Sequence, residues 1–138
     1  MKGIKPYIGF GGECREAFEF YRDALGGEIR GMLTYAESGQ GEGEMADKIM
    51  HAVFEFGDTV IMAADDPAGN ASGGNVSLAV GIDTVEEAEE MFAKMSDGGS
   101  VTMPLQETFW AARFGMLTDK FGIKWMFNCE KPHGAKTE

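Results

Sequence analysis

Cysteine, histidine and long apolar runs are all scarce in this sequence, and each scarcity excludes a class of protein or of functional site. Its only cysteines, Cys14 and Cys129, lie far apart in the chain and outside any C-x-x-C pair. A disulfide framework is therefore not expected, and both thiols should be reduced. No apolar run approaches the ~20 residues that a membrane-spanning helix needs. The opening MKGIKPYIGF also lacks the apolar stretch of a secretion signal, so we expect a cytoplasmic protein with no membrane partner.

Positive charge is scarce as well. The 138 residues contain 12 Lys and Arg against 23 Asp and Glu, which gives a net charge of -11. A chain of that charge repels phosphate backbones, so we expect no nucleic-acid partner. Hydrophobic residues make up 43% of the sequence, which is enough for a domain of this length to fold around its own core.

An internal repeat organises the chain. The stretch EAFEFYRDALGGEI at 16–29 resembles EAEEMFAKMSDGGSV at 87–101. In each stretch the apolar residues recur at helical spacing and a Gly-Gly pair follows, a pattern typical of a helix and its end. Thr84 and Glu87 form a capping-box pattern at the start of the second helix. Cys14 is in phase with the apolar stripe of the first helix, so we interpret it as a core residue rather than an activated thiol.

Strand-like runs surround both helices in the same order. One run precedes each helix and another follows it, and two more strands complete each half. These last strands are expected at 48–56 and 59–65, and at about 112–118 and 123–128. The order strand, helix, strand, strand, strand therefore occurs twice, which predicts an α+β fold of two βαβββ modules.

Composition marks the boundaries of the two modules. The segment DDPAGNASGGN, rich in Gly, Ser and Pro, separates them and is typical of a linker. We place the first module at 4–66, the linker at 67–74, the second module at 75–128 and a tail at 129–138.

Three segments carry a family resemblance. They are KPYIGFGGECREAFEFYRDALGGE, MHAVFEFGDTVIMAADD and FWAARFGMLTDKFGIKWMFN, and together they extend from about residue 4 to 128. With the duplicated strand order they resemble the vicinal oxygen chelate superfamily of glyoxalases, bleomycin-resistance proteins and extradiol dioxygenases, and its PhnB-like branch in particular. The resemblance implies curled mixed sheets that enclose a cavity, and commonly a homodimer. It also implies that metal-using members hold one divalent ion with four residues on cavity-facing strands.

The resemblance places those four metal positions at Pro6, Met62, Asn75 and Met126. Hard divalent ions prefer carboxylate oxygens, and zinc or nickel prefers imidazole, thiolate or carboxylate, so these side chains supply almost none of the required donors. An alignment shifted by one residue gives Tyr7, Ile61 or Phe127, which are no better. We therefore predict that the chain holds no metal and no other cofactor.

His51 is the one histidine within the modules, on the segment KIMHAVFEFGDTVIMAADD. This segment is typical of a hairpin with Gly57 and Asp58 as its turn residues. Counting back from the turn puts His51 opposite Ala64 and on the same face as Met62. Val53 and Glu55 share that face, whereas Ala52, Phe54 and Ile61 should pack toward the helix.

Three interpretations of His51 stay open. It is a hydrogen-bonded structural residue, a polar anchor for a ligand, or a general base oriented by Asp66. A weak catalytic hypothesis therefore rests on His51 and Asp66 together. Trp125 alternates with Met126, so we expect it in the core that faces the second helix, whereas Trp110 precedes a strand and could reach a ligand.

We expect a largely apolar cavity, lined by Pro6, Ile8, Phe10, His51, Met62, Asn75, Ser77, Trp110 and Met126. The leading hypothesis is metal-free binding of a small apolar or amphipathic molecule, similar in manner to bleomycin-resistance proteins. The alternative is a superfamily enzyme of lyase, isomerase or dioxygenase type that uses His51 or an unconventional metal site. PhnB-like sequences often carry a ubiquinone-pathway methyltransferase label, which ordinarily implies an S-adenosylmethionine site. The one glycine-rich turn, GFGGEC at 9–14, lacks the third glycine of a nucleotide loop and argues against that label.

Overall fold

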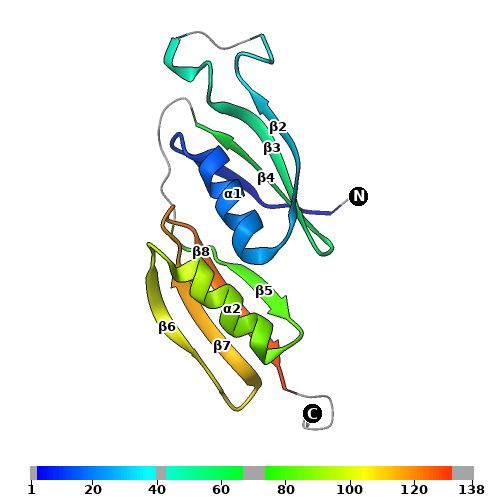
Figure 1. Cartoon of the computed structure of the whole chain (residues 1–138), viewed down its shortest axis with the longest axis vertical. Coiled ribbons are helices and arrows are strands. Elements are labelled where there is room, and N and C mark those ends of the chain that lie inside the picture. The colour runs from blue at the N-terminus through cyan, green and yellow to red at the C-terminus, as the bar shows by residue number, and fades with distance from the viewer. Residues whose placement is uncertain (1–2, 40–42, 67–73, 132–138) are drawn as a thin grey trace. The chain divides into compact units, whose positions relative to one another are not determined.

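The computed structural model describes residues 3–39, 43–66 and 74–131. Two compact units divide the chain, Met1–Ala71 and Ser72–Glu138. In each unit the described strands form one four-stranded sheet, and one α-helix lies across a face of that sheet (Figure 1). The predicted α+β fold with two strand, helix, strand, strand, strand modules is confirmed.

The first unit forms a mixed sheet in the order β1-β4-β3-β2. Strand β1 runs parallel to β4, while the β4–β3 and β3–β2 pairs are antiparallel. The elements are β1 Tyr7–Phe10, α1 Cys14–Leu25, β2 Glu28–Thr34, β3 Ile49–Phe56 and β4 Thr59–Asp65, with a short 3-10 helix at Gly43–Met45. The sequence pattern did not predict that 3-10 helix.

The second unit repeats this topology with the order β5-β8-β7-β6. Its elements are β5 Leu78–Ile82, α2 Val85–Ser96, β6 Ser100–Gln106, β7 Ala111–Thr118 and β8 Lys124–Glu130. Strand β5 pairs in parallel with β8, and the other two pairs are antiparallel. Strand β8 extends two residues into the segment expected as a tail, and residues 132–138 lie outside the described part of the chain.

The core of the first unit lies between α1 and its sheet. The apolar stripe of α1 is buried at Cys14, Ala17, Phe18, Tyr21, Ala24 and Leu25. Phe18 packs against Phe54 of β3 with 5.6 Å between the ring centroids, and against Phe10 of β1 in a T-shaped contact at 6.4 Å. Burying these large side chains supplies most of the stability of such a unit.

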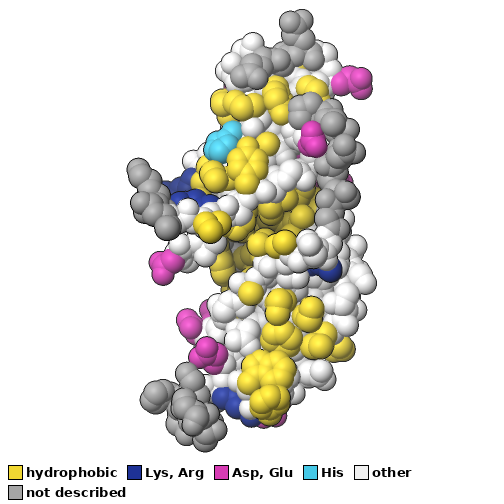
Figure 2. Space-filling model, turned by 180° about the vertical axis from the view of Figure 1, so that it is seen from behind, with side chains coloured by type: hydrophobic (Ala, Val, Ile, Leu, Met, Phe, Trp, Pro, Cys, Tyr) yellow, Lys and Arg dark blue, Asp and Glu magenta, His cyan; other side chains and the backbone are white. Residues whose placement is uncertain are grey.

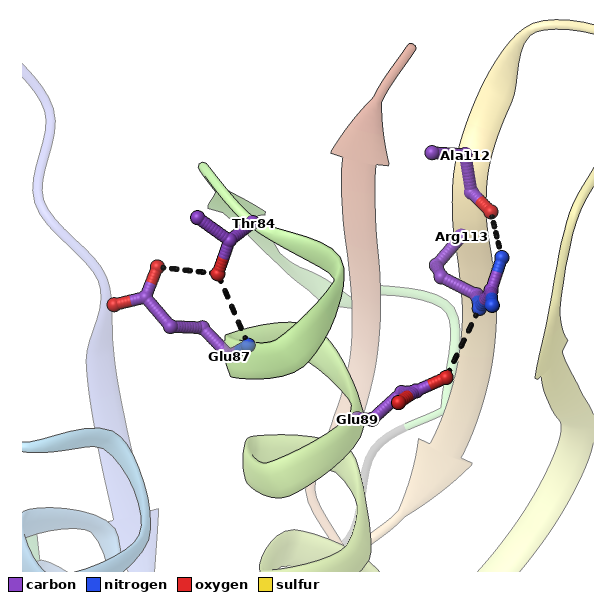
Figure 3. Close-up of polar contacts among 5 residues, drawn as sticks. All are labelled: Thr84, Glu87, Glu89, Ala112 and Arg113. Atoms are coloured by element: carbon purple, nitrogen blue, oxygen red, sulfur yellow. Dashed lines mark hydrogen bonds and ion pairs between the residues drawn. The ribbon is translucent and has the colours of Figure 1, made fainter. Parts of the chain in front are cut away.

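The core of the second unit is built in the same way. Phe92 of α2 meets Phe127 of β8 in a T-shaped contact with 5.6 Å between centroids. Trp125 is buried, as predicted, and its indole Nε1–H donates to the Asp119 carboxylate at 2.8 Å. The helix is tied to its sheet at the surface as well, because Arg113 of β7 lies 3.2 Å from the Glu89 carboxylate (Figure 3).

The ends of both helices follow the predicted chemistry. At the start of α2 the Glu87 N–H donates to Thr84 Oγ1 at 3.1 Å, which confirms the helix cap (Figure 3). Helix α1 ends at Gly26, which adopts the left-handed conformation with φ 86°. Gly98 follows α2 with φ 78°. A second glycine comes next in each unit, and a Cβ there would strike the backbone carbonyl of a neighbouring strand.

A buried carboxylate connects two segments of the first unit through hydrogen bonds. Asp65, at the end of β4, is 1% exposed. Its carboxylate accepts from the N–H groups of Gly12 at 3.0 Å, Cys14 at 2.9 Å and Ile49 at 2.8 Å. It therefore joins the start of α1 to the start of β3, two segments that sequence alone does not bring together.

Candidate functional site

The hairpin of β3 and β4 has the register that the sequence predicts. Phe56 pairs with Thr59, and Val53 pairs with Met62. Ala52, Phe54 and Ile61 are buried toward α1. Because side chains alternate along a strand, His51, Val53 and Met62 lie on the opposite face of the sheet, where they are half-buried.

Two neighbouring strands extend this face. Tyr7 of β1 pairs with Met62, and Leu33 of β2 pairs with His51. Tyr7 is 56% exposed and Leu33 is 38% exposed, which is unusual for side chains of this size. We call Tyr7, Leu33, His51, Val53 and Met62 the first open face. Seen from behind the helices, Figure 2 shows a histidine side chain with apolar side chains next to it.

His51 occupies a polar position within this apolar surface. Its ring lies 6.1 Å from that of Tyr7, centroid to centroid, at an interplanar angle of 42°. Among residues 3–39, 43–66 and 74–131, no hydrogen bond reaches the imidazole, whether from Asp66 or from another residue. Its ring nitrogens are therefore open to a group from outside this part of the chain.

The residues predicted on β1 require a correction. Phe10 is 1% exposed and packs against Phe18, and Ile8 pairs with the buried Ala63, so both face α1 rather than His51. Tyr7 takes their place on the first open face. Pro6 precedes β1, and its carbonyl accepts the Met62 N–H at 3.0 Å, which is a backbone role.

The second unit has a comparable surface. Ala79 of β5 and Met116 of β7 both pair with Met126 of β8, and Phe114 pairs with Asn128. Trp125 and Phe127 alternate with these residues and are buried, so this set lies on the face away from α2. We call Ala79, Phe114, Met116, Met126 and Asn128 the second open face.

Trp110 adjoins the second open face. It is 50% exposed, and its ring lies 5.5 Å from that of Phe114 at 63°. Phe109 stacks edge-on against Trp110 at 4.9 Å and is 88% exposed. Asn75 and Ser77, by contrast, precede β5, and Asn75 is exposed. The residue of β5 that pairs with Met126 is Ala79.

The metal positions implied by the resemblance can be tested against this register. The paired positions on β1 and β4 are Tyr7 and Met62, and those on β5 and β8 are Ala79 and Met126. Thioether, methyl and phenol groups are a poor donor set for a divalent ion. In the described ranges no cluster of three His, Cys, Asp or Glu could hold a metal. The residues present therefore do not fit the metal of the related enzymes.

The two cysteines offer no nucleophile. Both are buried and unpaired. Burial, reinforced by the Asp65 charge, raises the pKa of the Cys14 thiol to about 12. Burial also raises the pKa of Cys129. Because thiolate is the reactive form, thiol chemistry at neutral pH has no candidate here.

Six members of the open faces were not predicted from the sequence: Tyr7, Leu33, Ala79, Phe114, Met116 and Asn128. Tyr7 lies one residue from a predicted position, and Asn128 lies two residues beyond Met126, so strand alternation was the signal for Asn128.

In the part of the chain that the structure describes, no helix has the length and apolarity to span a membrane.

Comparisons with known proteins agree with this architecture. The model of the family described as Glyoxalase/Bleomycin resistance protein/Dioxygenase superfamily matches residues 4–127. Protein YjdN of Escherichia coli is 33% identical, over 93% of this chain and 95% of its own length. The crystal structure of protein PA1353 from Pseudomonas aeruginosa is 43% identical, with a TM-score of 0.85 over 96% of this chain and 100% of that one. The PhnB protein from Bacillus cereus, described as a putative 3-demethylubiquinone-9 3-methyltransferase, is 28% identical with a TM-score of 0.79, over 93% of this chain and 99% of that one.

Proposed function

The chain belongs to the Glyoxalase/Bleomycin resistance protein/Dioxygenase superfamily, and within it we propose that this protein binds a small apolar or amphipathic molecule without a metal. The binding surface is the first open face, with Trp110 and the second open face as a further apolar surface. The absence of a disulfide between the two free cysteines favours a cytoplasmic location.

One observation carries this proposal. A single imidazole lies among exposed apolar side chains on the face of the sheet that α1 does not cover. Ligand sites combine such apolar walls with a few polar groups that set orientation. The Tyr7 hydroxyl could add a second polar group beside His51.

A homodimer is part of the proposal. Each sheet ends in two edge strands, β1 and β2 in the first unit and β5 and β6 in the second. Unpaired strand edges expose backbone hydrogen-bonding groups that proteins usually cover. A second copy of the chain, related by a twofold axis, is the simplest cover for them.

Native mass spectrometry of freshly purified protein tests these statements together. We expect a dimer of 14.9 kDa chains without stoichiometric metal, because the paired positions lack ligating side chains. The neutral dye Nile red, added as a probe, should bind to the same species. One tightly held nickel, zinc, iron or manganese ion per chain, lost on chelation together with an activity, would contradict the metal-free proposal. A monomer at micromolar concentration would contradict the dimer.

The alternative function is a superfamily enzyme that uses His51. It is favoured by the observation that no hydrogen bond reaches the imidazole from the residues that the structure describes. Two substitutions distinguish a His51 that anchors a ligand from a His51 that acts as a general base. If His51 anchors a ligand through a hydrogen bond, His51→Phe should weaken Nile red binding about fivefold, while His51→Gln keeps a donor and should weaken it less. If His51 is a general base, both substitutions should abolish any turnover that the wild type shows.

Melting temperatures of the same two variants provide the control. An unchanged dye affinity with a lowered melting temperature would assign His51 a structural role and remove it from the site.

A further inference from the structure

Asn128 carries an unusual buried atom. Its Oδ1 is fully buried and has no hydrogen-bond partner, and it is the one side-chain oxygen or nitrogen of this kind among the described residues. Such atoms are rare in native proteins, because an amide oxygen loses its water on burial without receiving another donor. An orphaned acceptor of this kind requires an explanation, and a ligand is one.

The register places Asn128 on the second open face. It pairs with Phe114 of β7 on one side and with Gly81 of β5 on the other. Trp125, Phe127 and the equally buried Cys129 occupy the alternate positions of β8 toward α2. The amide of Asn128 therefore lies on the same face as Met126 and Phe114.

Open space lies beside the Asn128 side chain, which as a whole is only half-buried. Gly81 has no side chain, and a Cβ built there would meet no atom within 4 Å. Paired residues on neighbouring strands share a face, so this space is next to Asn128. On the other side Phe114, with Trp110 against its ring, forms an aromatic wall. An aromatic wall, an open space and an unsatisfied polar atom are together the elements of a small ligand subsite.

The chemistry of the subsite selects a class of ligand. A hydroxyl group can donate to the amide oxygen, and it can equally accept from the amide nitrogen if the side-chain amide is turned over. A flat aromatic skeleton matches the rings of Phe114 and Trp110. The net charge of -11 disfavours carboxylate and phosphate groups.

We infer that Asn128, Gly81 and Phe114 form a subsite for a neutral aromatic molecule that carries a hydroxyl group. This inference rests on the proposed small-molecule binding and names the ligand class and its specificity residue. Asn128 forms the hydrogen bond to the hydroxyl, Gly81 provides the room, and Phe114 with Trp110 contacts the ring.

A matched pair of probes tests the subsite with the full-length protein. β-Naphthol carries a hydroxyl where β-methylnaphthalene carries a methyl group of similar size. Titrations followed by the methyl NMR signals of Met116 and Met126 report on the second open face, and the signal of Met62 reports on the first. We expect the wild type to bind β-naphthol about tenfold more tightly, with shifts at Met116 and Met126, since a satisfied buried hydrogen bond is worth about a factor of ten.

Two variants complete the test. Asn128→Leu should bind both probes equally and should melt at the same or a higher temperature, because it removes the orphaned amide. Gly81→Leu should prevent both probes from shifting Met116 and Met126, because its side chain fills the space. A merely structural Asn128 would lower the melting temperature on substitution and leave the preference for the hydroxyl intact.

The possible failures are distinguishable. Equal binding of the two probes to the wild type, or a preference that survives Asn128→Leu, would overturn the subsite while leaving apolar binding in place. Shifts confined to Met62 would also overturn it, since they locate binding on the first open face. If neither probe shifts any of the three signals at millimolar concentration, the subsite is wrong. The proposed function fails with it if Nile red also does not bind.

Discussion

Gly27→Ala is expected to lower the free energy of unfolding by about 3 kcal/mol, the upper part of the range for forced overpacking. The Cβ of an alanine at this position would collide with the carbonyl oxygen of Glu55 and would lie 2.6 Å from the ring of Phe54. The carbonyl belongs to β3 and cannot move without breaking its pairing with β2 and β4. The ring of Phe54 is itself held by Phe18 and Tyr21.

Gly31→Ala is the matched control for this prediction. Gly31 lies on β2 of the same unit, and a Cβ there would meet no atom within 4 Å. Its alanine variant should stay within about 0.5 kcal/mol of the wild type, since the loss of chain entropy on folding becomes smaller. Urea unfolding followed by far-ultraviolet circular dichroism measures both variants. Both tryptophans lie in the second unit, so tryptophan fluorescence alone would not follow this change. Similar stabilities of the two variants would show that β3 yields to the added methyl group.

Asp65→Ala is expected to destabilise the protein by about 4 kcal/mol, because it removes the acceptor from three backbone N–H groups at once, two of them in buried hydrogen bonds. The donors belong to Gly12 and Cys14 at the start of α1 and to Ile49 at the start of β3. None of these N–H groups has a replacement acceptor within its own helix turn or strand end. The loss should therefore loosen the helix and the hairpin together.

Asp65→Asn separates the hydrogen bonds from the side-chain volume. Asparagine keeps one oxygen for the Gly12 and Cys14 donors but turns an NH2 group toward the Ile49 N–H, so we expect an intermediate loss. Asp58→Ala, at the exposed turn of the β3–β4 hairpin, serves as the control and should change stability by less than about 0.5 kcal/mol. If Asp65→Ala were no worse than Asp58→Ala, the three hydrogen bonds would contribute little.

How much of the site could be predicted depended on the kind of strand pairing. The face of His51, Val53 and Met62 was predicted because a two-residue turn joins β3 to β4 and sets the register from within one short segment. No such turn connects β1 to β4. Their parallel pairing joins residues from opposite ends of the unit, and nothing local sets the phase of β1. Phe10 was therefore assigned to the wrong face, and Tyr7 was missed.

The second unit shows a related limitation. Strand β5 pairs in parallel with β8, and nothing local sets how far along the chain this pairing begins. Asn75 and Ser77 were therefore predicted four residues before Ala79 and Gly81, which occupy these places in the structure. The hydrogen bonds of Asp65 could not be predicted either. A carboxylate that accepts from backbone N–H groups of distant segments produces no periodic pattern in the sequence. The helices, by contrast, were predicted closely, since their apolar spacing, the Thr84 cap and the Gly-Gly ends are all local signals.

The strand order has a consequence for the folding of the chain as it is synthesised. The first strand made in each unit, β1 or β5, can find its parallel partner only when the last strand, β4 or β8, has left the ribosome. The hairpin of β3 and β4 can form early, and β1 then closes the sheet at its far edge. Because β4 ends at Asp65 and β5 begins at Leu78, no strand of one sheet is interleaved with the other in the sequence. The first unit can therefore complete its hydrogen-bonded ladder while the second is still being translated, so its apolar strands are exposed only briefly to aggregation.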